Sequence, residues 1–77
     1  MMTTIKIKPG IYQHFKGSLY QVFHTCKHSE TEETMVFYQS LYGDYSFWVR
    51  PLTLFKSKVI YEGKEKQRFT LIQALQN

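Results

Sequence analysis

With 77 residues, the chain has room for one domain, and its single cysteine excludes an internal disulfide. No apolar run approaches the roughly 20 residues of a membrane-spanning helix, and the first residues lack the apolar core of a signal peptide. Ten Lys and Arg residues against six Asp and Glu residues give a formal charge of +4, which favours anionic partners. We therefore expect a small cytoplasmic protein that binds no membrane.

Turn residues divide the chain into short segments rich in aromatic and β-branched residues. Pro9-Gly10 precedes the first segment, so residues 1–8 are predicted to form a flexible N-terminal arm. The segments predict strands over 10–15, 19–27, 34–41 and 46–50. Polar or glycine-containing turns separate them at 16–18, 29–33 and 42–45.

The last third of the chain mixes helical and strand signals. Pro51 lacks a backbone donor and ends the fourth strand, and the spacing of Leu52 and Phe55 predicts a helical turn with both side chains facing inward. Segments 58–62 and 67–72, around Gly63, predict a last hairpin or a pair of short strands, followed by a tail over 73–77. Five to six short antiparallel strands with a helical turn before the last ones predict an all-β domain over residues 9–72, a small SH3-like barrel or roll.

The segment 48–51 (WVRP) contains the only tryptophan of the chain beside an arginine. Alternate residues of a strand share a face, so Trp48 and Arg50 should point one way and Phe47 and Val49 the other. An indole beside a guanidinium favours stacking and cation–π contacts. We interpret it as part of an aromatic and basic binding patch made of His14, Tyr38, Tyr42, Trp48, Arg50 and Arg68.

This patch predicts a non-enzymatic binding module that recognises an anionic or extended partner, such as a protein segment, a nucleotide or single-stranded nucleic acid. A structural interpretation competes with it: Asp44 neutralises Arg50, and Tyr12, Tyr20 and Tyr38 are core residues whose hydroxyls reach the rim.

Two other function classes remain open. Residues 1–29 and 45–61 contain no acid, so the alternative is a nucleic-acid-binding protein driven by a basic face. The third class is an enzyme acting on a small anionic substrate, with His14 or His28 as general base.

Two clusters could carry further chemistry. His24, Cys26 and His28 alternate along the second predicted strand, but other Cys and His donors are scarce, so Cys26 is interpreted as a small buried hydrophobe and no metal is expected. The segment 28–31 (HSET) combines a base, a nucleophile and a carboxylate, yet neighbours on an extended chain point in opposite directions. It predicts a turn in which the Ser29 and Thr31 hydroxyls cap backbone amides. We therefore assign no catalytic residue and no cofactor.

Several motifs occur together and in order along the chain. They are Gly10-Ile11-Tyr12-Gln13-His14-Phe15-Lys16-Gly17, Tyr20, His28-Ser29-Glu30-Thr31, Tyr38, Trp48-Val49-Arg50-Pro51, Phe55 and Arg68-Phe69. They resemble a small bacterial family catalogued as domain of unknown function 1653, over residues 9–72. The resemblance implies an SH3-like barrel, and it implies no activity and no ligand residue. His24 and Cys26 stand where this family is expected to have small or aliphatic residues, which argues further against a metal site.

Overall fold

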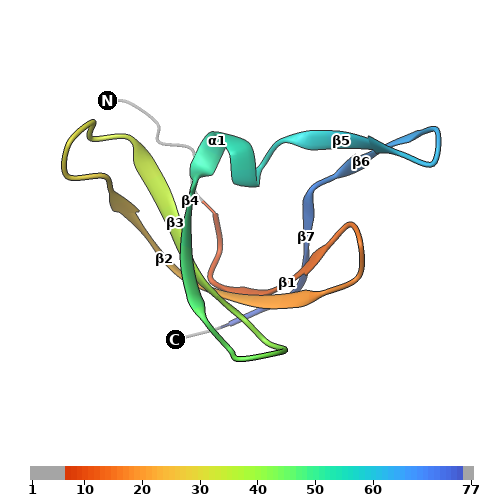
Figure 1. Cartoon of the computed structure of the whole chain (residues 1–77), viewed down its shortest axis with the longest axis horizontal. Helices are drawn as coiled ribbons and strands as arrows, with labels where there is room; N and C mark the ends of the chain where they lie inside the picture. Colours follow the sequence, from red (N-terminus) through yellow and green to blue (C-terminus); the bar gives the residue numbers. More distant parts are fainter. Residues whose placement is uncertain (1–6, 76–77) are drawn as a thin grey trace.

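The computed structural model describes residues 7–75, which form seven strands and one short helix (Figure 1). In chain order the elements are β1 (Gly10–His14), β2 (Leu19–Lys27), β3 (Thr34–Ser40), β4 (Phe47–Pro51), α1 (Leu52–Phe55), β5 (Lys58–Tyr61), β6 (Lys64–Gln67) and β7 (Phe69–Ala74). The all-β class and the helical turn are confirmed, and β2 has the predicted bounds. The seven strands exceed the predicted five to six, because the last part of the chain contains three strands.

The pairing of these last strands differs from the prediction. Strands β4-β3-β2-β1-β7 form one antiparallel sheet in that order, whereas β5 and β6 form a separate hairpin. Glu62 and Gly63 join β5 to β6 with φ values of 53° and 79°. Two consecutive positive φ values are the backbone of a tight two-residue hairpin turn, so β5 pairs with β6 at once. Strand β7 then pairs with β1, which is far away in sequence.

The predicted closed barrel is not found. Figure 1 shows a curved sheet, and its outer strands, β4 and β7, are not paired with each other in the described part of the chain. Register shifts beside Ile11 in β1 and beside Val22 in β2 are the irregularities that bend a sheet. After Pro51 the chain turns into α1 across the open side, where Leu52 and Phe55 are buried. Burial by this helical turn takes the place of closure by strand pairing.

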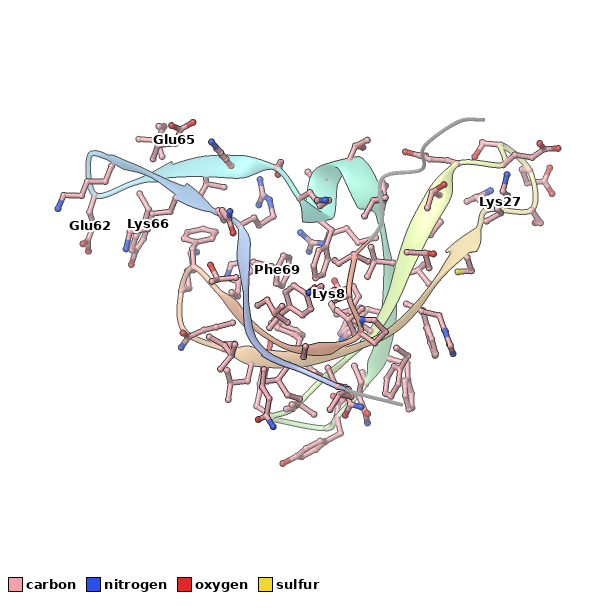
Figure 2. All side chains as sticks on the ribbon, turned by 180° about the vertical axis from the view of Figure 1, so that it is seen from behind. Lys8, Lys27, Glu62, Glu65, Lys66 and Phe69 are labelled. Carbon is pink, nitrogen blue, oxygen red and sulfur yellow. The ribbon has the colours of Figure 1, made fainter. Side chains whose placement is uncertain are left out.

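The core fills the concave side of the sheet. Its buried residues come from four strands and α1: Tyr12, Val22, Val36, Tyr38, Leu52, Phe55 and Phe69. The rings of Phe55 and Phe69 are parallel, with centroids 4.0 Å apart. Figure 2 shows Phe69 on β7, with side chains filling the inside of the curve. This arrangement leaves one end of the concave face, beside β4, for the candidate site.

The two predicted terminal segments are described only in part. Residues 1–6 of the arm and 76–77 of the tail lie outside the described residues. Ile7 packs against the core, and the Lys8 carbonyl accepts a hydrogen bond from the Tyr12 hydroxyl at 2.7 Å. At the other end, β7 continues to Ala74, and the Leu75 amide donates to the Pro9 carbonyl at 3.0 Å. None of the described helical structure has the length and hydropathy needed to cross a bilayer.

Candidate functional site

A pocket lies at the edge of the concave face, beside β4. Its volume is about 240 Å³, and the residues that line it are Tyr20, Tyr38, Tyr42, Trp48 and Arg50. We call the cavity that these five residues line the concave pocket. Trp48 and Arg50 both line it, whereas Phe47 stacks on Phe37 on the opposite face of the sheet, with ring centroids 5.7 Å apart. The predicted alternation along β4 is therefore confirmed, and the Trp48 side chain is 50% exposed.

The tyrosines of the concave pocket are held by contacts between strands. Tyr38 is buried and lies opposite Trp48 in the β3–β4 register. The hydroxyls of Tyr20 and Tyr42 are hydrogen-bonded at 2.8 Å. Burial, followed by this hydrogen bond, raises the pKa of Tyr20 to about 12. Tyr20 is not among the predicted patch residues, although alternation with the fully buried Val22 places it on the concave face.

The Arg50 guanidinium is the cation of the pocket. Its Nε donates to the Tyr38 hydroxyl at 3.2 Å, and its Cζ lies 5.6 Å from the centre of the Phe69 ring. Asp44, the predicted structural partner of Arg50, instead accepts hydrogen bonds from the Ser46 hydroxyl at 2.7 Å and the Ser46 amide at 3.2 Å. The Ser46 hydroxyl also lowers the pKa of Asp44. No carboxylate within residues 7–75 pairs with Arg50.

His14 and Arg68, the other two predicted patch residues, lie next to the concave pocket rather than in its wall. The His14 ring meets the Phe69 ring edge-on at 5.0 Å, and the Arg68 Nε donates to the Ser57 hydroxyl at 2.9 Å. Burial lowers the pKa of His14, and the positive charges of Arg50, Arg68 and Lys16 lower it further. His14 therefore lies in the positive field of Arg50 and Arg68 beside Phe69, and this field favours its neutral form.

Hydrogen bonding sets the role that His14 can have. Its Nδ1 accepts a hydrogen bond from the Lys16 amide at 3.2 Å. A neutral imidazole whose Nδ1 accepts carries its proton on Nε2, so His14 offers an N–H donor. His28 resembles it, because its Nδ1 accepts from the Glu30 amide at 3.0 Å in the β2–β3 turn. These contacts suit structural or donor roles better than the predicted general base.

The β2–β3 end of the molecule corrects one expectation and confirms another. Cys26, predicted to be buried, is exposed, because this end of β2 extends beyond the core. Thr31 caps a backbone amide as predicted, with its hydroxyl accepting from the Glu33 amide at 3.1 Å, whereas the Ser29 hydroxyl caps no amide within residues 7–75 and His28 Nδ1 accepts from the Glu30 amide instead. No group of three His, Cys, Asp or Glu side chains able to hold a metal is present among the described residues.

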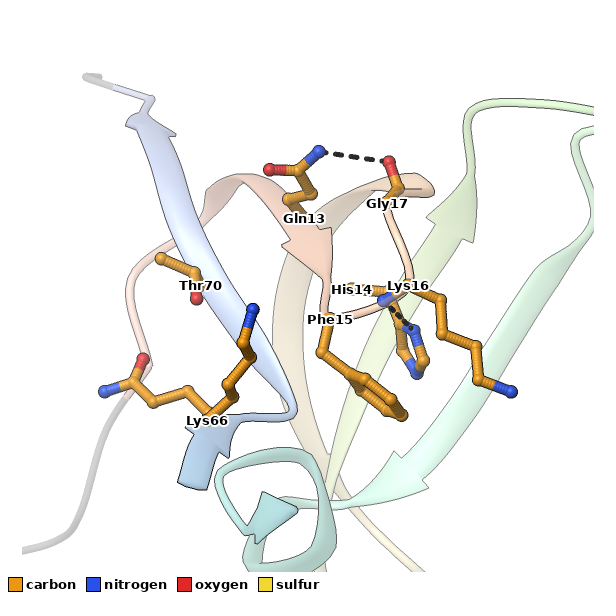
Figure 3. Close-up of a pocket in the computed structure, with 8 residues that line it drawn as sticks. Gln13, His14, Phe15, Lys16, Gly17, Lys66 and Thr70 are labelled. Atoms are coloured by element: carbon orange, nitrogen blue, oxygen red, sulfur yellow. Dashed lines mark hydrogen bonds between the residues drawn. The ribbon is translucent and has the colours of Figure 1, made fainter. Parts of the chain in front are cut away.

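A larger hollow lies between the β1–β2 turn and strands β6 and β7 (Figure 3). Its volume is about 480 Å³, and it is lined by Gln13, His14, Phe15, Lys16, Gly17, Lys66, Gln67 and Thr70. Six of these eight residues are exposed, and the Gln13 side-chain amide is bound to the Gly17 carbonyl at 3.1 Å. Exposed side chains form most of this hollow, so it is less preorganised than the concave pocket, whose wall includes the buried Tyr38.

The fold and the pocket together define a small all-β protein with an aromatic and cationic hollow at one sheet edge. The chain belongs to the protein family of unknown function DUF1653, whose sequence profile matches residues 10–71, and the predicted resemblance is thereby confirmed. It is similar to the crystal structure of a DUF1653 protein from Bordetella bronchiseptica, with 26% identity and a TM-score of 0.83 over 92% of this chain and 94% of that chain. No curated protein matches the sequence. The family has no assigned function.

Proposed function

We propose that this protein is a non-enzymatic binding module whose concave pocket receives an anionic group of its partner. The terminal N–H groups of Arg50 carry this proposal. A guanidinium has five N–H donors, and the only hydrogen bond that Arg50 makes within residues 7–75 uses Nε. Four donors in a fixed plane therefore stay available for a carboxylate or a phosphate, which such a plane binds with two parallel hydrogen bonds.

The surroundings of Arg50 support this role. The guanidinium packs over Phe69 and is partly buried, so an anion reaching it is less screened than on an open surface. His14 adds an N–H donor and Arg68 a second cation nearby. An anion in the concave pocket would be attracted by all three groups.

The aromatic walls support recognition of a flat or extended ligand. Trp48 and Tyr42 are both about half exposed, so their rings offer apolar area at little cost in conformational entropy. The hydrogen bond between the hydroxyls of Tyr20 and Tyr42 holds the β3–β4 turn against β2. The pocket is therefore preformed on this side.

The two alternative functions have weaker support. Among the lysines of the acid-free residues 1–29, Figure 2 shows Lys8 near the middle of the molecule and Lys27 at one end, so these two cations lie apart. Glu30, Glu32 and Glu33 follow Lys27 in the adjoining turn and offset its charge. For the enzyme, the hydrogen bond at Nδ1 makes His14 a donor rather than a base.

Phenyl phosphate tests the proposal, because it joins a flat ring to an anionic group, and phenol is its uncharged counterpart. In ¹⁵N–¹H correlation spectra we expect phenyl phosphate to shift the amides of Tyr20, Tyr42 and Trp48 at millimolar concentration. Arg50→Gln should weaken binding at least tenfold, because the anion loses its bidentate donor. Lys64→Gln, in the remote hairpin, serves as the control that removes one charge. Equal binding of phenol, or equal weakening by Lys64→Gln, would contradict the proposal.

A further inference from the structure

Strand β4 is an edge whose outward backbone groups can be assigned. The Ser40 amide donates to the Ser46 carbonyl at 3.0 Å, and the β3–β4 register continues without a shift through Tyr38 opposite Trp48. Hydrogen-bonded pairs alternate along an antiparallel ladder, so Trp48 and Arg50 direct their N–H and C=O groups toward β3. Phe47 and Val49 therefore direct theirs outward, where no strand in the described part of the chain pairs with β4.

The centre of this edge lacks the devices that usually block strand addition, and the two that β4 does have, the concave-facing charge of Arg50 and Pro51, lie at its end. Its centre, Phe47-Trp48-Val49, carries no charge, and these side chains are 58%, 50% and 57% exposed. Natural edge strands are commonly protected by lysine, by an inward charge or by a covering loop. Pro51 ends the open segment because it has no N–H to donate. Two residues, Phe47 and Val49, thus offer up to four hydrogen bonds to an added strand.

The neighbourhood of β4 specifies the chemistry of an added antiparallel strand. Side chains of the added strand that lie opposite Trp48 and Arg50 would point to the concave side, and those opposite Phe47 and Val49 to the convex side. The residue opposite Arg50 would meet the available guanidinium, which favours a carboxylate. Residues 45–61, which include β4, contain no acid, so the charged side chains that this segment brings to the added strand are all positive. Phe47 and Val49 favour apolar neighbours.

We infer that the β4 edge binds an extended peptide as an added antiparallel strand, with the pattern acidic-apolar-any-apolar. In this register the acidic residue lies opposite Arg50, the first apolar residue opposite Val49 and the second opposite Phe47. The inference rests on the proposed function, because the concave pocket supplies the site for the carboxylate. It adds the class of partner, a protein segment, and the backbone contacts that select an extended conformation.

The test uses a synthetic peptide, acetyl-Ser-Glu-Val-Thr-Val-Ser-amide, and hydrogen exchange of the whole protein. The peptide should slow exchange of the Phe47 and Val49 amides at least tenfold at saturation. The Trp48 and Arg50 amides, already bonded to β3, should change little and serve as internal controls. N-methylation of either valine should weaken binding at least tenfold, because each valine N–H is bonded to β4. N-methylation of the threonine should have little effect, because its N–H points away from β4.

A second comparison tests the acidic position. Replacing the glutamate of the peptide by glutamine should weaken binding to the wild type, and the Arg50→Gln variant should lose this preference for glutamate. If both peptides bind the wild type equally, the assigned chemistry is wrong.

The failure of this inference can be told apart from failure of the proposed function. If phenyl phosphate binds the concave pocket but the peptide does not slow exchange at Phe47 and Val49, strand addition is wrong and the anion pocket stands. Binding of a thymidylate octamer at the pocket, without binding of the peptide, would also overturn the inference and would point to nucleic acid. If phenyl phosphate also fails to bind, both proposals fall.

Discussion

Phe69 joins the hydrophobic core to the candidate site, so replacing it by leucine tests how far the site depends on the core. The Phe69 side chain is 5% exposed and stacks on Phe55, while Arg50 and His14 approach the same ring. Phe69→Leu keeps much of the apolar volume but changes its shape and loses the aromatic pairs. The free energy of unfolding should therefore fall by about 2–3 kcal/mol. A chain of 77 residues has a free energy of unfolding of roughly 4–12 kcal/mol, so the variant should still fold.

Phe55→Leu is the matched control. Phe55 is 1% exposed and is the other ring of the same stacked pair, but among the described residues the ring contact of His14 and the cation–π contact of Arg50 are with Phe69 and not with Phe55. In thermal unfolding monitored by circular dichroism, both variants should melt roughly 8–24 °C below the wild type. Phe69→Leu should change the chemical shifts of the His14 ring protons and the affinity for phenyl phosphate much more than Phe55→Leu, because Arg50 and His14 lie directly against the Phe69 ring, whereas Phe55 reaches Arg50 only through Tyr38.

Two results would refute this reasoning. If Phe55→Leu shifted the His14 ring protons as much as Phe69→Leu, the site would respond to core packing in general rather than to the Phe69 ring. If Phe69→Leu left both the melting temperature and the site unchanged, the ring would support neither the core nor the positions of Arg50 and His14.

Three further predictions follow from the same contacts. Because the folded protein lowers the pKa of His14, the unfolded chain takes up a proton there first, near pH 6.5. The stability due to neutral His14 is therefore complete above this pH and is lost as the pH falls toward the folded-state pKa. In urea titrations at several pH values, the free energy of unfolding should decrease less steeply with falling pH in His14→Asn than in the wild type. A Cβ at Gly10 would clash with the Gln73 carbonyl oxygen of β7, so Gly10→Ala should lower the free energy of unfolding in urea by about 3 kcal/mol. Gly43 has a φ of 62° and open space around an added Cβ, so Gly43→Ala should lower the free energy of unfolding by only about 1 kcal/mol. Equal losses in the two variants would show that the close approach of Gly10 to β7 does not matter. Trp48 fluorescence should be quenched more strongly by iodide than by caesium, and Arg50→Gln should reduce this difference; an unchanged ratio would mean that Arg50 does not attract anions into the pocket.

Local features of the sequence are sufficient for much of the secondary structure. The turn residues at 16–18 and 42–45 predict two hairpins, and both turns are closed by backbone hydrogen bonds, from the Gly17 amide to the His14 carbonyl and from the Tyr45 amide to the Tyr42 carbonyl. Alternation along β4 places Trp48 and Arg50 on one face, because the pleat of a strand depends only on neighbouring residues. The composition of each segment and of its turns therefore determines the positions of these turns and strands to within a few residues.

Only the tertiary structure decided how the strands pair and which charges remain available. Strand β7 pairs with β1 rather than with β5, and α1 covers the side that a closed barrel would have sealed. Asp44 binds Ser46 instead of Arg50, while Phe69 brings Arg50 and His14 together from opposite parts of the chain. These outcomes depend on competition among distant partners for burial and hydrogen bonds. A local pattern does not contain that information, because the same alternating strand can lie in the middle of a sheet or at its edge.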